Sequence, residues 1–264
     1  GEAMAPPYCL SIAAWKDGYY SGRIGSTFHF EETDGTRWLP WNPEVKITLK
    51  KIINPVPMYA SQAHIWMLPG AAVNGTAAKF DLVQCDWLPP FGKGTVPDLV
   101  FTVEEAIRID DWRGSTKLRL GFTNPQDGII DLDVEPIGKE KSSLLLPQEA
   151  PADGYKKEIV IVSGYPTPEP ESPEIRVSQM DGDEDWGLIF RVRTKVDESG
   201  KIISACYGKM NRGPGIGKTK DGSLYIKFRY HFNPEPNSRA LEFDTKKNLL
   251  KAEGRLKWVR VVDP

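Results

Sequence analysis

The stretch SLYIKFRYHF at residues 223–232 shows the clearest alternation of apolar and polar residues in the chain. Every second residue from Leu224 onwards is apolar, and the positions between carry Tyr, Lys, Arg and His231. A β-strand turns successive side chains to opposite faces, whereas a helix needs apolar residues three or four positions apart. The stretch therefore predicts a half-buried antiparallel strand, with His231 on its polar, surface side.

Similar patterns recur along the chain and predict further strands. VKITLKK at 45–51 and FRVRTKV at 190–196 alternate in the same way, and EIVIVSG at 158–164 is also typical of a strand. The dipeptides Asp17-Gly18 and Asp221-Gly222 supply the positive φ angles of tight turns. The segment VEEAIRI at 103–109 fits either two helical turns or an edge strand. The sequence thus predicts an all-β protein, most typical of a sandwich or jelly-roll.

Proline-rich passages suggest how the strands are divided. Residues 146–157 and 165–174 are rich in proline, and the second resembles an extended, semi-rigid connector. We therefore expect two antiparallel β-sandwich or jelly-roll-like modules in tandem, covering residues 1–150 and 151–264. A single large sandwich is the alternative.

Composition narrows the classes of function. The 264 residues are 40 % hydrophobic and 27 % charged with a net charge of −2, so we expect neither nucleic-acid binding nor membrane insertion. Three separated cysteines, Cys9, Cys85 and Cys206, lack a C-x-x-C pattern, allow at most one disulfide and leave its pairing open. The many Trp, Pro and Gly residues favour an extracellular, periplasmic or cell-surface protein.

RGPGIGKTKDG at 212–222 comes close to the phosphate-binding pattern G-x-x-x-x-G-K-[ST], with Arg212 in place of the first glycine. That motif needs a helix after it, because the phosphate sits on the helix N-terminus. Here Asp221-Gly222 and a strand follow instead. The sequence predicts a hairpin tip and no bound nucleotide.

DGDEDWG at 181–187 places Asp181, Asp183 and Asp185 two residues apart, as at the start of a calcium loop. The helix–loop–helix pattern fails because Trp186 and Val192 occupy the glycine and glutamate positions. An acidic turn is the leading interpretation and no cofactor is expected. Calcium bound by the three aspartates, with Glu184 as an extra ligand, is the alternative.

IIDLDVEP at 129–136 turns Asp131, Asp133 and Glu135 to one face of a predicted strand. The stretch resembles the E-I-D-I-E strand of the jelly-roll laminarinase and lichenase family of glycoside hydrolases over five residues. That resemblance implies an acid pair acting on a glycosidic bond, although Asp131 replaces the family's nucleophilic glutamate. A solvated strand face explains the same alternation.

Tryptophans near turns suggest a binding surface. Trp38 and Trp41 flank Pro40 just after a turn, and Trp87 and Phe91 bracket two prolines. Exposed aromatic rings form stacking platforms for sugar rings, and stiff loops lower the entropic cost of binding. We therefore expect a secreted or envelope-associated, non-catalytic binding protein whose partner is a polysaccharide or other glycan. The alternatives are a glycoside hydrolase or lyase using the acidic strand, and a structural or protein-interaction module.

Overall fold

Within the residues that the computed structural model describes, every regular element is a β-strand, which confirms the predicted fold class. The described residues are 12–24, 32–33, 38–39, 46–69, 75–108, 114–134, 141–165, 169–170, 172–178, 185–219 and 221–251. The strands are β1 (Ile12–Ala14), β2 (Gly22–Ile24), β3 (Glu32–Thr33), β4 (Trp38–Leu39), β5 (Val56–Met67), β6 (Ala78–Asp81), β7 (Asp86–Trp87), β8 (Leu99–Arg108), β9 (Gly114–Gly121), β10 (Gly128–Asp133), β11 (Lys141–Ser142), β12 (Glu158–Tyr165), β13 (Ile175–Val177), β14 (Trp186–Val196), β15 (Ile202–Met210), β16 (Gly215–Lys218), β17 (Leu224–Asn233) and β18 (Phe243–Asn248).

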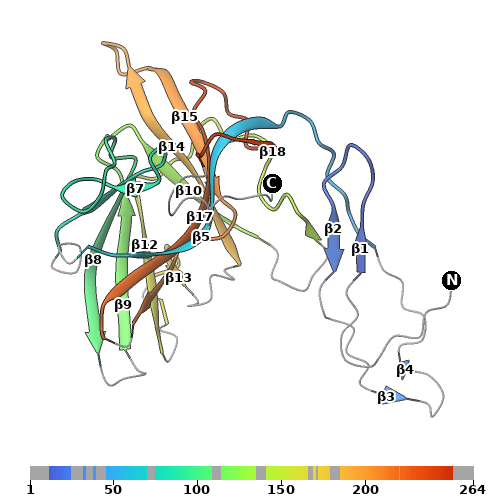
Figure 1. The fold of residues 1–264 in the computed structure, drawn as a ribbon, viewed down its shortest axis with the longest axis horizontal. Helices are drawn as coiled ribbons and strands as arrows, with labels where there is room; N and C mark the ends of the chain where they lie inside the picture. The colour runs from blue at the N-terminus through green and yellow to red at the C-terminus, as the bar shows by residue number, and fades with distance from the viewer. Residues whose placement is uncertain are drawn as a thin grey trace.

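Two large mixed sheets form the body of the protein (Figure 1). The seven-stranded sheet has the order β10-β14-β15-β17-β5-β18, with β16 paired to β17, and the six-stranded sheet has the order β13-β12-β9-β8-β6-β7. Each is antiparallel apart from one parallel pair, β18 with β5 and β12 with β13. Their apolar faces meet in a shared core, where the Phe228 ring lies 5.2 Å from that of Phe80 and 5.6 Å from that of Phe101. The arrangement is consistent with a β-sandwich.

The strand that the alternation at 223–232 predicts is found as β17. Its apolar residues from Leu224 to Phe232 are buried in the shared core. The opposite side of β17 differs from the expectation near its end, because His231 is fully buried and its ring lies 5.3 Å from that of Phe243. Leu146, Ala150 and Leu241 form a second apolar layer on the outer side of the seven-stranded sheet. His231 lies against a separate cluster, in which Phe243 packs with Met58 and Ala60. His231 is therefore not a surface histidine.

In two other segments, the presence or absence of strand pairing tests what the sequence pattern predicted. Residues 46–50 alternate like a strand but join no ladder, and the Lys50 carbonyl instead accepts a hydrogen bond from the Tyr20 N–H at 2.8 Å. Residues 103–108 lie in β8, which settles the helix-or-strand alternative in favour of a strand. Among the residues that the structure describes, the part of β8 beyond Phe101 pairs only with β9, which is the arrangement of an edge strand.

Both large sheets draw strands from either side of residue 150. β5 pairs with β17 and β10 with β14 in the seven-stranded sheet, and β9 pairs with β12 in the six-stranded sheet. The division into modules at residue 150 stays a prediction, as does the choice between tandem sandwiches and one large sandwich.

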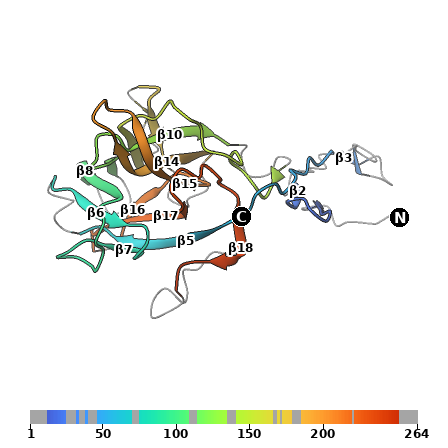
Figure 2. The same ribbon diagram turned by 90° about the horizontal axis from the view of Figure 1, so that it is seen from above.

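A small arm of short strands lies to one side of the two large sheets (Figures 1 and 2). β1, β2 and β11 form a three-stranded sheet, and β3 pairs with β4. We call these five strands and the β1–β2 turn the arm. Its strands β1 to β4 come from the start of the chain, whereas β11 comes from residues 141–142.

Candidate functional site

The turn between β1 and β2 presents the most exposed large apolar side chain among the described residues. Trp15 follows β1 and is 80 % exposed. The turn continues through Asp17-Gly18, where Gly18 has a φ of 77°, a value that glycine adopts without steric cost. An aromatic ring so open to water, beside charged side chains, is a candidate binding group.

Hydrogen bonds and ring contacts hold this turn in place. The Tyr19 N–H donates to the Lys16 carbonyl at 3.0 Å, and the Lys16 ammonium lies 4.7 Å from the centre of the Tyr19 ring. The Ile52 N–H donates to the Gly18 carbonyl at 2.8 Å, which ties the turn to the segment leading into β5. The exposed ring of Trp15 is therefore carried on a braced turn.

The tryptophans singled out by the sequence occupy different environments. Trp38 belongs to β4 of the arm, but its side chain and the whole of Trp41 lie outside the described residues. Trp87 is only 5 % exposed, and its ring packs edge-on against Phe80 at 5.3 Å and Phe101 at 5.7 Å.

Phe91, in the loop after β7, is 46 % exposed, so this loop offers solvent one aromatic ring and not two. The sequence argument missed Trp15. Its position two residues before the recognised Asp17-Gly18 turn was the available signal.

The acidic strand forms an ion-pair network at the edge of the seven-stranded sheet. Arg176 of β13 donates to Asp131 at 2.7 Å and to Asp133 at 2.7 Å, and Lys156 donates to Asp131 at 2.9 Å. Partial burial acts to raise the pKa of Asp131, but the hydrogen bonds from Lys156 and Arg176 outweigh it and lower that pKa. A lowered pKa keeps Asp131 ionised, as a nucleophile must be, but its two carboxylate oxygens are already held by Lys156 and Arg176. Glu135 lies outside the described residues.

The two loops that resemble ligand motifs have simpler local structures. The phosphate-like stretch, predicted to be a hairpin tip, contains a strand of its own: residues 215–218 form β16, which is mostly buried and pairs with β17. The Thr219 N–H donates to the Ser223 carbonyl at 2.8 Å where this hairpin turns. Of the predicted calcium ligands, Asp181, Asp183 and Glu184 lie outside the described residues, and Asp185 is an exposed residue whose carbonyl accepts from the Val134 N–H. Among described residues, no group of three His, Cys, Asp or Glu side chains is placed to hold a metal ion.

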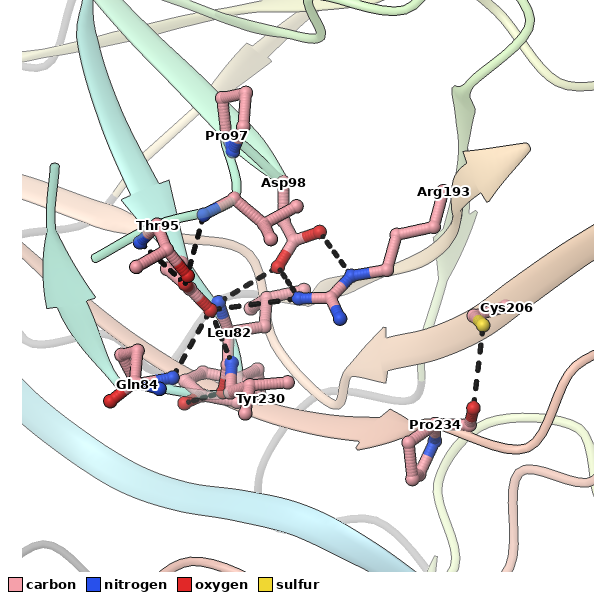
Figure 3. A network of polar contacts seen from close by, with 12 residues as sticks. Leu82, Gln84, Thr95, Pro97, Asp98, Arg193, Cys206, Tyr230 and Pro234 are labelled. Atoms are coloured by element: carbon pink, nitrogen blue, oxygen red, sulfur yellow. Dashed lines mark hydrogen bonds and ion pairs between the residues drawn. The ribbon is translucent and has the colours of Figure 1, made fainter. Parts of the chain in front are cut away.

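A buried polar network joins the two large sheets (Figure 3). Arg193 of β14 reaches across to Asp98, which precedes β8, with two hydrogen bonds of 2.8 Å each. The Asp98 side chain is fully buried, so burial raises the pKa of its carboxyl, while the pairing with Arg193 opposes that shift. The second buried acid, Asp81, accepts from the backbone N–H groups of Val83, Gln84, Thr95 and Val96. These contacts identify the network as a structural clamp.

A lysine lies in the second apolar layer without a hydrogen-bond partner among the described residues. Lys209 of β15 is fully buried, and burial lowers the pKa of its amine to about 7. The nearest opposing charge is that of Glu242, which is already engaged. Its carboxylate accepts from the N–H groups of Ile53 at 3.0 Å and Asn54 at 2.6 Å and from the Gln148 amide at 2.9 Å.

A comparison of the chain with protein-family models, curated proteins and solved structures finds no match. In the described part of the chain, no helix is long and apolar enough to span a membrane.

Proposed function

We propose that the protein is a glycan-binding protein and that the arm carries its binding surface. The observation that carries this proposal is the 80 % exposure of Trp15 on a braced turn of the arm. The C–H face of a sugar ring stacks on an aromatic ring, and neighbouring polar groups orient its hydroxyls. Lys16 and Asp17 directly follow Trp15 and supply a donor and an acceptor.

The position of the arm supports this function. The arm lies to one side of the two large sheets (Figure 2). Trp38 belongs to the same arm, on β4, so two tryptophan positions come from this small region. A protein that binds such polymers belongs outside the cell or on its surface, which agrees with the compositional expectation.

Replacing Trp15 with alanine should weaken glycan binding at least tenfold, because the exposed stacking surface is lost. Because the ring is exposed, the change should leave the free energy of unfolding within about 0.5 kcal/mol of wild type. Affinity electrophoresis against a panel of soluble polysaccharides, followed by titration of tryptophan fluorescence with those that retard the protein, measures the loss.

Tyr165→Ala is the matched control, since Tyr165 is a 62 % exposed aromatic residue on β12 of the six-stranded sheet. It should bind like wild type. Equal retardation of wild type and Trp15→Ala by every polysaccharide that binds would contradict the proposal, as would a panel in which nothing binds.

A further inference from the structure

A groove of about 320 Å³ lies on the outer face of the six-stranded sheet, at the end of β9. Val100 of β8, Gly121 of β9 and Glu158 of β12 form one row across this face, because Gly121 is paired with both of the others. Gly121 has no side chain, and this leaves a hollow between its two neighbours. The loop after β9 forms a wall, with Phe122 and Pro125 among the lining residues.

The lining offers an apolar surface and polar groups together. Val100, Phe122 and Pro125 supply carbon surface, and Thr102 and Thr123 supply hydroxyl groups beside it. Such a mixture suits a polyol ring, whose C–H face needs apolar contact while its hydroxyls need hydrogen-bond partners. The volume falls at the lower end of the range of about 300–1,000 Å³ that is usual for ligand sites, which favours a ligand of one or two rings.

The charged residues of the groove differ in what they already bind. The Arg119 guanidinium forms ion pairs with Glu104 and Glu158. The Asp127 carboxylate accepts a hydrogen bond from the Thr194 N–H at 2.9 Å. The Lys157 ammonium is exposed and forms no ion pair with any residue that the structure describes. One lysine is thus left at the groove to meet an anionic group on a ligand.

We propose that this groove is a binding site for an acidic sugar unit, a uronate, whose ring lies over Gly121 and whose carboxylate meets Lys157. The site is separate from Trp15 in the arm, so it adds a second contact to the proposed glycan-binding function. A polymer that engaged both sites would gain avidity without any change in either contact.

Gly121→Val tests the site directly, because it fills the hollow without disturbing the sheet. A Cβ at this position meets its nearest atoms at 3.4 Å, the Glu158 Cβ, and 3.6 Å, the Lys157 carbonyl oxygen, which are ordinary contacts. A β-branched residue also suits a strand better than glycine does. The melting temperature of Gly121→Val, measured beside that of wild type, shows whether a loss of binding comes from the filled hollow or from unfolding. Lys157→Ala tests the same site without adding a side chain.

The probes are methyl glucuronide and methyl glucoside, which differ only in the carboxylate, with binding followed by NMR chemical-shift perturbation. We expect wild type to bind the glucuronide at least fivefold more tightly than the glucoside, and Gly121→Val to bind neither. Lys157→Ala should lose the preference, whereas Lys201→Ala, an exposed lysine in another turn, should keep it.

Trp15→Ala should bind the glucuronide like wild type, which separates this proposal from the one for the arm. Three results would overturn the groove site. These are unchanged glucuronide binding by Gly121→Val, equal binding of the two probes by wild type, and no binding of either probe.

Discussion

Arg193→Ala is expected to lower the free energy of unfolding by about 3–5 kcal/mol, the usual cost of removing one partner from a buried ion pair. The loss leaves the Asp98 carboxylate, whose side chain is fully buried, without its bidentate partner. Asp81 lies on the other side of the same guanidinium, 3.6 Å away, so two buried acids then face each other. Urea unfolding followed by tryptophan fluorescence measures the effect.

The pH dependence of the free energy of unfolding of Arg193→Ala tests whether the unpaired Asp98 carboxylate causes the destabilisation. Without Arg193, burial raises the pKa of Asp98 further above its unfolded value, so the folded state holds a proton that the unfolded state releases. The destabilisation should then be largest near pH 7 and should shrink as the pH falls below about 3.8, the ordinary pKa of an aspartate, because the unfolded chain then also binds a proton at Asp98. Adding Asp98→Asn to Arg193→Ala should recover part of the loss, because it removes the uncompensated charge.

Lys195→Ala, two residues along β14, is the matched control for Arg193→Ala. Lys195 is exposed, so its replacement should change the free energy of unfolding by less than about 0.5 kcal/mol. Equal stability of Arg193→Ala and Lys195→Ala would show that the clamp between the sheets contributes nothing.

The placement of Arg193 marks a limit of prediction from periodicity. Alternation in FRVRTKV assigns Arg193 to the polar face of its strand, and the strand itself is found as β14. The ladder between β14 and β15 shifts register after Val192, and Arg193 has a φ of 57°. A bulge of this kind re-aims a side chain, and here it turns the guanidinium toward Asp98 on the opposing sheet. No local pattern in the sequence predicts this bulge.

Contacts between residues far apart in the chain explain the other differences between the sequence-based predictions and the structure. The apolar face of β17 could be predicted because alternation is a local property, whereas the burial of His231 involves contact with Phe243 of β18, a separate strand. The aromatic side chain at Trp87 was recognisable, but its burial depends on Phe80 and Phe101 of neighbouring strands. The groove at Gly121 arises from a row of three paired strands, which a single sequence does not display.

Lys209→Met is expected to raise the free energy of unfolding by roughly 2–4 kcal/mol at pH 7, since it replaces a buried amine with an apolar chain of similar length. Lys209 is fully buried and has no hydrogen-bond partner among the described residues. Thermal and urea unfolding of the variant and of wild type give the difference. Lys201→Met, at an exposed position, should leave stability within about 0.5 kcal/mol of wild type.

The pH dependence of the free energy of unfolding tests whether the buried amine of Lys209 is the cause of this difference in stability. Burial lowers the pKa of the Lys209 amine to about 7, whereas a lysine in an unfolded chain has its ordinary pKa of 10.5. Between these values the unfolded chain binds a proton that the folded protein does not, so the stability of wild type should rise with pH from about 7 to about 10. Lys209→Met should lack that rise, and the two proteins should converge in stability at the alkaline end. A rise of the same size in both proteins would show that another group is responsible.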